Sequence, residues 1–310
     1  MGNFFIGVKF MNEGIESVKN TSKNRGNRQI VNFMSEKLKR IFISIIVPIL
    51  FLCIWTIAAN KIDNPIILPH ISQVLDNFRH ATNDFIGLGS IPKNILVSLV
   101  RVLLGYVIGV IIALPLGILM GYKENISLLF STFINIFRPV PALGWVPLIL
   151  AWFGVASLAT LFKIPYGPKQ VFFNNFKFAM IFIIGIGTFF PVVSGAAFGV
   201  KNVPKTLIES AKVLGASNRD IFFKILLPGA GPNIINGLRG GLGSAWGCLV
   251  AAEMLPGSLS GVGYMITHAY ELARTDLVIT GIICIGLVGA LLDYIFILVE
   301  RKHFAWVSRR

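Results

Sequence analysis

Charged side chains are scarce in this sequence of 310 residues. They make up 14% of it, against roughly 25% in a soluble domain. Apolar residues supply 55%, and 31 glycines accompany them. A soluble globule could not cover that much apolar surface, and disordered chains contain few apolar residues. The composition therefore predicts an integral membrane protein.

Residues that bind metals or carry out catalysis are also few. The three cysteines, Cys53, Cys248 and Cys284, lie in separate apolar stretches without the spacing of a disulfide framework or a metal site. The four histidines are scattered, and neither HExxH nor the phosphate-binding pattern GxxxxGKS/T occurs. We therefore expect no metal, no cofactor and no catalytic centre in this chain.

Long apolar runs are the main feature of the sequence. About 20 apolar residues span the hydrocarbon core of a bilayer. Six runs approach or exceed that length: Ile41–Ala59, Ile95–Gly121, a stretch of 126–162 that ends near Trp152, Phe178–Val200, Ala230–Ala252 and Val278–Val299. They predict an all-α integral membrane protein with about six transmembrane helices. The expected domains are a tail at 1–40, a membrane domain at 41–300 and a second tail at 301–310.

The net charge of +14 is unevenly distributed along the chain. With the N-terminus inside and six crossings, the inner segments contain 18 lysines and arginines, and the outer segments, of nearly equal total length, contain seven. Basic residues collect on the cytoplasmic side of membrane proteins, so both termini are expected in the cytoplasm. The anionic inner face of the bilayer accounts for the positive charge, and no nucleic acid is needed.

The loop that joins the fourth and fifth predicted spans has the pattern of two short helices. Asn202 is a suitable N-cap and Pro204 a suitable first residue for the first helix. Gly215 follows the last apolar turn, where glycine most easily adopts a left-handed conformation.

The second helix of this loop is expected to begin at Ser217, with Asp220 three residues later as in a capping box. Pro228 and the glycines after it are expected to end this helix before the next span. An elbow of two amphipathic helices on the cytoplasmic side could fit a groove of another protein.

The residues of this elbow resemble a known family. Glu209-Ser210-Ala211, three residues, Gly215, nine residues and Ile225-x-Leu227-Pro228 match the spacing of the EAA loop in binding-protein-dependent ABC importer permeases. The one departure is Ser210 in place of the middle alanine, and serine is also small. We refer to residues 201–228 as the EAA-like loop.

The resemblance covers about residues 65–305. Within that range, several segments are similar to the nitrate/sulfonate/taurine branch of the family. The matching segments are Ser98–Tyr106, Arg138–Leu148, Trp152–Gly154, Leu226–Ala230 and Gly261–Tyr264. One departure is an insertion at about 156–175, which the charge bias places outside, where a binding protein would dock.

The resemblance implies a type I ABC importer permease (MetI-like) fold in the plasma (inner) membrane of a prokaryote. It implies a pair of ABC ATPase subunits that bind ATP and magnesium, a second permease copy in a homodimer, and an external substrate-binding protein. The implied ATPase-coupling residues are Glu209, Ser210, Ala211, Gly215, Ile225, Leu227 and Pro228.

Three arginines within the predicted spans are candidates for the translocation path: Arg101, Arg138 and Arg239. They would favour a small anion such as nitrate, a sulfonate, taurine or bicarbonate. Alternatively, arginines near span ends reach to the lipid headgroups. Glu253 cannot pair with Arg239 within one helix, because fourteen residues rise about 21 Å.

The small residues of the fifth predicted span and the function of the chain each allow more than one interpretation. The small residues Gly237, Gly240, Gly241, Gly243, Ser244 and Gly247 either allow close helix packing or line a pore. The function could also be that of an ion-coupled secondary carrier or of a membrane scaffold. A carrier would need acidic residues near mid-membrane, and Asp293 is the one acidic residue well within a span.

Overall fold

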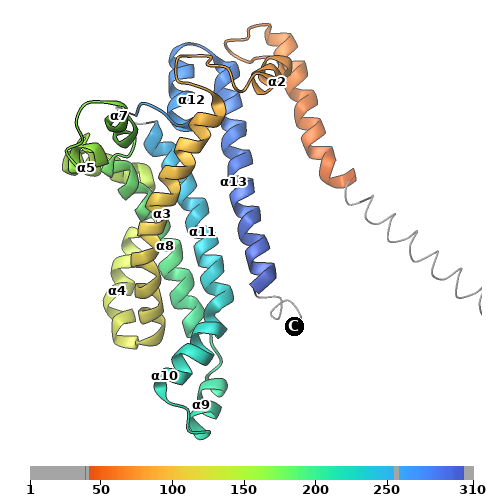
Figure 1. The fold of residues 1–310 in the computed structure, drawn as a ribbon. Coiled ribbons are helices and arrows are strands. Elements are labelled where there is room, and N and C mark those ends of the chain that lie inside the picture. The colour runs from red at the N-terminus through yellow and green to blue at the C-terminus, as the bar shows by residue number, and fades with distance from the viewer. Residues whose placement is uncertain (1–38, 40–41, 255–257, 304–310) are drawn as a thin grey trace, which may run out of the picture. The chain divides into compact units, whose positions relative to one another are not determined.

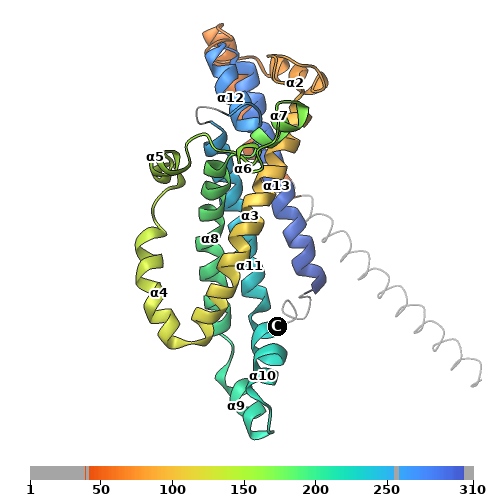
Figure 2. The same cartoon turned by 60° about the vertical axis from the view of Figure 1, so that its left-hand side comes forward.

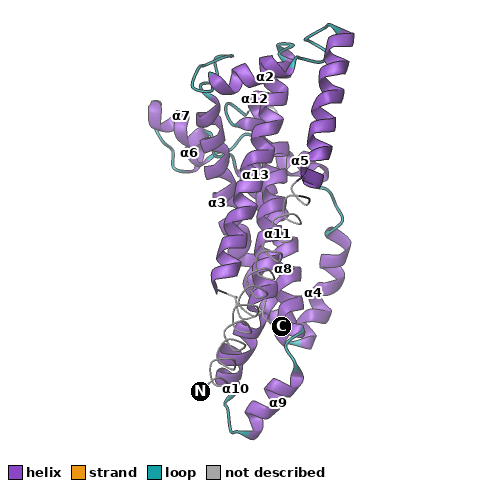
Figure 3. Cartoon of the chain, turned by 90° about the vertical axis from the view of Figure 1, so that its right-hand side faces the viewer, coloured by secondary structure: helices purple, strands orange, loops and turns teal. Residues whose placement is uncertain are grey.

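The computed structural model describes residue 39 and residues 42–254 and 258–303. The chain divides into two compact units, Met1–Asn64 and Pro65–Arg310. The predicted tails at 1–40 and 301–310 fall largely outside the described residues. Figure 3 shows that helices joined by loops make up the second unit.

The described part of the first unit contains one helix, Phe42–Ile62. Its apolar side chains are largely exposed, as suits a helix whose solvent is lipid. Asp63 follows with a φ of 48°, and its N–H donates to the carbonyl of Ala59 at 3.0 Å, which closes the last turn. The first predicted apolar run is therefore helical.

The second unit runs between two ends that lie far apart. Its elements, in chain order, are α2 Ile71–Arg79, α3 Ile91–Tyr122, α4 Glu124–Phe137, α5 Ala142–Phe153, α6 Leu158–Leu161, α7 Pro168–Asn174, α8 Phe178–Lys201, α9 Lys205–Val213, α10 Asn218–Asp220, the π-helix η1 Ile221–Leu226, α11 Leu227–Glu253, α12 Val262–Glu271 and α13 Thr275–His303. α9 and α10 lie at one end and α2 and α12 at the other (Figure 1). We call these the loop end and the α12 end.

α8 packs closely against α3 through small residues that recur every fourth position. A Cβ on Gly105 would lie 2.6 Å from the Cβ of Ile184, and one on Gly117 would lie 2.7 Å from the Cβ of Ala196. Ala113, between these two glycines on the same face, is fully buried. The repeat allows the two backbones to approach closely, as is common between membrane helices.

The glycines of α11 lie on two different faces. Gly237 packs against α8, where a Cβ on Gly195 would come 2.5 Å from the Cα of Gly237. Gly241 is also buried against α8, next to Val192. In contrast, a Cβ on Gly243 or Gly247 would meet nothing within 4 Å. Close packing thus explains one face of α11, and the other face is open.

Among the described residues, four helices are long and apolar enough to cross a membrane: Phe42–Ile62, α3, α8 and α13. α11 has 27 residues but is not one of the four. Its glycines and Arg239 make it less apolar than the others. The expected number of six crossings stays a prediction.

The predicted stretch 126–162 forms two main helices, α4 and α5. α4 has Arg138 at its C-cap, and α5 has Pro141 at its N-cap. Pro139 also lies in this break, and prolines end helices because they lack an N–H and restrict the preceding residue.

The insertion at 156–175 contains α6 and α7 (Figure 2). Backbone contacts close it at its base. Ser157 and Lys177 form an antiparallel bridge. On either side of it, the N–H of Leu158 donates to the carbonyl of Phe176 at 3.0 Å, and the N–H of Phe178 donates to Ala156 at 3.1 Å. The insertion therefore leaves and rejoins the helical core at one point.

Candidate functional site: an exposed loop and two ion pairs

The EAA-like loop turns at Gly215, as predicted. α9 ends in a Schellman motif, in which the N–H of Ala216 donates to Ala211 at 2.9 Å and the N–H of Gly215 donates to Lys212 at 3.0 Å. Gly215 has a φ of +81°. The start of α9 differs from the prediction, because Pro204 is the N-cap and Asn202 is the C-cap of α8.

The second helix of the loop begins at Ser217, as predicted. The Ser217 hydroxyl accepts a hydrogen bond from the N–H of Asp220 at 3.2 Å. The Asp220 carboxylate in turn contacts Lys224 Nζ at 2.6 Å. The hydrogen bond from Lys224, and then that from Ser217, hold the pKa of Asp220 below its ordinary value.

The expected break at Pro228 is wrong. The π-helix η1 continues directly into α11, and Pro228 lies in the first turn of α11. In η1 the N–H of Leu227 donates to the carbonyl of Phe222, five residues back. A π-turn shifts the preceding carbonyls, which removes the clash that proline causes in a regular α-helix. One continuous helical path therefore joins the loop to the centre of the unit.

The predicted coupling residues do not all face the same way. Glu209, Ser210, Gly215 and Pro228 are exposed, Ile225 and Leu227 are half-buried, and Ala211 is buried. The tip of the loop is apolar and exposed, with Val213 at 88% and Leu214 at 86%. These two neighbouring side chains form a small exposed apolar patch at the tip of the loop.

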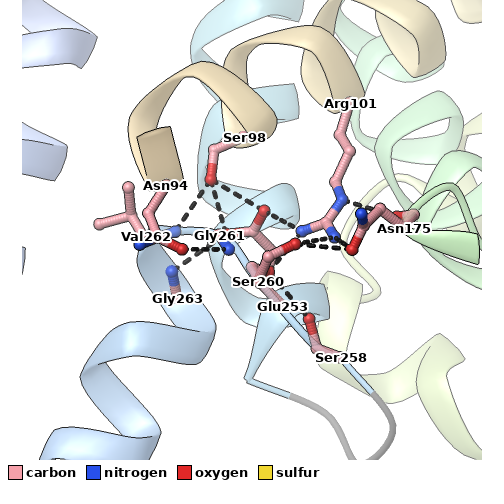
Figure 4. A network of polar contacts seen from close by, with 10 residues as sticks. All are labelled: Asn94, Ser98, Arg101, Asn175, Glu253, Ser258, Ser260, Gly261, Val262 and Gly263. Atoms are coloured by element: carbon pink, nitrogen blue, oxygen red, sulfur yellow. Dashed lines mark hydrogen bonds and ion pairs between the residues drawn. The ribbon is translucent and has the colours of Figure 1, made fainter. Parts of the chain in front are cut away.

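Arg101 and Glu253 form a fully buried ion pair near the α12 end (Figure 4). Arg101 Nη1 lies 2.6 Å from Glu253 Oε1, and the two side chains are 1% and 0% exposed. Ser98 donates to the same carboxylate at 2.8 Å, and the N–H of Gly263 donates to it at 3.0 Å. The pair thus connects α3, α11 and the start of α12.

The same arginine holds the end of the insertion. Arg101 Nε donates to the carbonyl of Asn175 at 2.8 Å, and Nη1 donates to the carbonyl of Ser260 at 2.7 Å. Lys177, next to this site, is buried, and burial followed by the charge of Arg101 lowers its pKa. The insertion is therefore anchored to the membrane helices through Arg101.

A second ion pair lies between the long helices α11 and α13. Arg239 donates to both carboxylate oxygens of Asp293, from Nε to Oδ1 and from Nη2 to Oδ2 at 2.7 Å. This pair is partly exposed, with Arg239 at 34% and Asp293 at 47%. As expected from the spacing, Arg239 does not pair with Glu253.

The structure separates the three candidate arginines of the path. Arg101 is buried in an ion pair, Arg239 is partly exposed in another, and Arg138 is exposed in the break between α4 and α5. The acidic partners of the pairs, Glu253 and Asp293, were not predicted. Position along the spans could have indicated both, since Arg101 and Glu253 lie towards the same end and Arg239 and Asp293 towards the middle.

Metal ligands do not cluster in the part of the chain that the structure describes: no three His, Cys, Asp or Glu side chains gather where they could hold an ion. Cys248 and Cys284 are buried.

Comparison with solved structures gives the fold. An inward-facing crystal form of the MetNI methionine ABC transporter matches with a TM-score of 0.54, over 68% of this chain and 94% of that chain, at 17% sequence identity. This likeness shows the fold, which is the type I (MetI-like) fold of ABC importer permeases. The predicted all-α, MetI-like fold is confirmed, whereas the predicted number of spans stays a prediction.

Sequence comparisons then give the family. The family model described as binding-protein-dependent transport system inner membrane component matches residues 89–304. A putative ABC transporter permease of Methanocaldococcus jannaschii is 43% identical over 268 residues, 86% of this chain and 93% of that protein. The taurine transport permease TauC of Escherichia coli is 32% identical over 254 residues, 81% of this chain and 84% of that protein. The nitrate import permease NrtB of Leptolyngbya laminosa is 36% identical over 196 residues, 63% of each chain.

The chain belongs to this family of inner-membrane permease components. Such components work with an ATPase and a binding protein. Family membership confirms the resemblance seen in the sequence, and it favours the permease over the secondary carrier and the scaffold that the sequence had left open.

Proposed function

We propose that this permease subunit imports a small solute with an anionic group, delivered by an external binding protein and driven by a separate pair of ATPase subunits. The observation that carries the proposal is the exposed EAA-like loop at one end of the unit. Its apolar tip, Val213 and Leu214, has no role in the packing of the helices.

The loop supplies a rigid contact for the ATPase. The Schellman turn at Gly215 fixes the angle between the two short helices. Ile208 of α9 and Phe222 of η1 pack against the same buried cluster, which holds both helices in place. ATP and magnesium bind to the partner ATPase, and this chain supplies the surface that the ATPase moves. Its coupling residues are Glu209, Ser210, Ala211, Gly215, Ile225, Leu227 and Pro228.

Movement of the loop is transmitted to the membrane through one helix. The path from α10 through η1 into α11 is continuous, so a displacement of the loop displaces α11 directly. α11 carries Arg239 near its middle and Glu253 at its end. Alternating access means that the path opens to one side of the membrane at a time. It needs two conformations whose equilibrium is shifted by ATP at one end of the unit and by the binding protein at the other.

The assembly has the loop end in the cytoplasm of a prokaryotic cell, with both termini on that side of the plasma (inner) membrane. Two identical permease copies form the channel in this proposal. The α12 end and the insertion at 156–175 face outward, where the binding protein docks. The bias of lysines and arginines towards the predicted inner segments supports this orientation.

The substrate class follows from the relatives, whose names include taurine and nitrate permeases. Nitrate, sulfonates, taurine and bicarbonate share an anionic group and small size. Arg239, partly exposed in the middle of α11, is the arginine best placed to meet such a group. Arg101 is buried in its network, and Arg138 lies between α4 and α5.

Copurification tests the proposal directly. The chain is expressed with the products of its neighbouring genes, extracted in detergent and purified by a tag on the permease. An ATPase subunit is expected to co-elute, and its activity is expected to rise when the binding protein and its ligand are added. Stable solute uptake by the permease alone in liposomes, without ATP, would contradict the proposal.

A further inference from the structure

We propose that Arg239 and Asp293 together form a charge-balanced binding site for a small zwitterion, a solute that carries an ammonium and an acid group. This inference rests on the proposed function, because it needs a translocation path along α11. The inference goes beyond the proposed function by adding Asp293 to the translocation path and by assigning the class of solute.

The Arg239–Asp293 pair is more exposed than the Arg101–Glu253 pair. Arg101 and Glu253 are 1% and 0% exposed and are surrounded by further hydrogen bonds, so that pair is structural. Arg239 and Asp293 are 34% and 47% exposed, although they lie in the long helices α11 and α13. A charged pair that is this accessible within a membrane span is a candidate for function.

Lipid does not suit this surface. Charged residues within membrane spans face the interior of a bundle or a water-filled cavity, because contact with the hydrocarbon is costly. The open face of α11 continues alongside the pair, since Gly243 and Gly247 have nothing within 4 Å of a Cβ position. The pair and the open glycines therefore mark one side of α11 as the wall of a polar path.

A hollow of about 300 Å³ adjoins the ion pair. It is lined by Arg239, Leu242, Gly243, Trp246, Gly289, Leu292, Asp293 and Phe296. That volume is at the small end for ligand sites and suits a solute of a few heavy atoms. The aromatic rings of Trp246 and Phe296 give it walls that an ammonium group can contact favourably.

The charges of this hollow sum to zero, and this distinguishes a zwitterion from a simple anion. An anion that binds the guanidinium of Arg239 must displace Asp293, whose carboxylate is then left without its partner. The bound anion would then lie beside this unpaired carboxylate, and like charges at short range repel each other. A zwitterion avoids this, because its acid group pairs with Arg239 while its ammonium pairs with Asp293.

Asp293 is therefore the specificity-determining residue of the site. Without it, Arg239 would present a single positive charge and would accept any small anion. With it, the site favours solutes that replace both halves of the ion pair. The order of preference should thus depend on the ammonium group and not on the acid group alone.

The experiment compares two solutes of nearly the same shape. Taurine carries an ammonium and a sulfonate, and 1-propanesulfonate has a methyl group in place of the ammonium. Uptake of both radiolabelled solutes is measured in cells that express the permease with its ATPase and binding protein. The binding protein is kept the same throughout, so a change in the ratio between permease variants belongs to the permease.

The key variant is Asp293→Asn. The ratio of taurine uptake to 1-propanesulfonate uptake is expected to fall at least tenfold relative to the wild type. The matched control is Glu124→Gln, which removes an exposed carboxylate at the start of α4, and it is expected to leave the ratio unchanged.

An unchanged ratio in Asp293→Asn would overturn the inference while leaving the proposed function intact. It would mean that the pair only joins α11 to α13, or that a second copy of the chain covers it. Failure of the wild type to take up either solute, while the ATPase still co-elutes with it, would also overturn the inference and leave the proposed import of another small anion intact. Failure of the proposed function shows separately, as the absence of a co-eluting ATPase.

A charge-swapped variant guards against loss of folding. Arg239→Asp combined with Asp293→Arg retains the ion pair and the charge balance. Its uptake ratio is expected to stay within threefold of the wild-type value, even if Asp293→Asn does not accumulate in the membrane. A tenfold loss of taurine preference in a well-expressed swap would count against the charge-balanced site.

Discussion

Removal of one partner of the buried Arg101–Glu253 pair should destabilise the protein strongly. In Arg101→Met the carboxylate of Glu253, which is 0% exposed, keeps Ser98 and the N–H of Gly263 but loses its counter-charge. Breaking a buried pair in this way costs about 3–5 kcal/mol. Glu253→Met should cost a similar amount, because it leaves the guanidinium of Arg101 buried without its counter-charge.

The double variant Arg101→Met/Glu253→Met separates this electrostatic effect from lost packing. Replacing both members of a buried pair by apolar residues is often neutral. The carbonyls of Asn175 and Ser260 would still lose a donor, and Ser98 and the N–H of Gly263 would lose their acceptor, at about 1 kcal/mol each. The double variant is therefore expected to be no less stable than either single variant, with a coupling of at least about 2 kcal/mol.

Thermal unfolding of the purified protein in detergent micelles measures these effects, and limited trypsin digestion locates them. Because Arg101 anchors Asn175, Arg101→Met should increase cleavage at Lys163 and Lys169 in the insertion. Cleavage at Lys212 in the EAA-like loop should not change. Additive losses in the two single variants, or equal increases in cleavage at all three lysines, would refute the reasoning.

Three further predictions concern the loop and the helix packing. Gly215→Val should lose about 1–2 kcal/mol at its φ of +81° and fail to retain the ATPase on a column, whereas Gly215→Asn should retain it. Gly195→Ala should lower the midpoint of thermal unfolding, because its Cβ would lie 2.5 Å from the Cα of Gly237. The free energy of unfolding should fall by about 1–3 kcal/mol. Gly247→Ala should leave the midpoint unchanged, because a Cβ there meets nothing within 4 Å. The pKa of Asp220 is depressed from 3.8, so its capping contribution is present above that value and is lost as pH falls through the lowered pKa. Amide exchange in α10 should show this loss, and Asp220→Asn should abolish it.

Local signals in the sequence were enough to predict the long apolar helices and the elbow, but not the short helices α2, α6, α7 and α12. The hydrophobic runs depend only on composition, and the turn at Gly215 and the cap at Ser217 depend on a few neighbouring residues. The break expected at Pro228 failed because a proline has one effect in a regular helix and another after a π-turn. That difference depends on the hydrogen bonds of the preceding turn, which the sequence pattern does not reveal.

The ion pairs depend on tertiary structure and therefore could not be derived from periodicity. Arg101 and Glu253 are separated by 152 residues, and Arg239 and Asp293 by 54. The sequence identified the arginines as unusual within apolar spans, yet it gave two roles for them, path lining or contact with headgroups. For Arg101 the structure shows a third role, as the anchor of the insertion.

The most direct test of the account is photo-crosslinking from the tip of the EAA-like loop. A photoreactive amino acid replaces Leu214, which is 86% exposed, and in a matched variant it replaces Tyr166 of the insertion, which is 97% exposed. We predict that the ATPase subunit is captured from position 214 and not from position 166. Capture of the ATPase from position 166 and not from position 214 would contradict it.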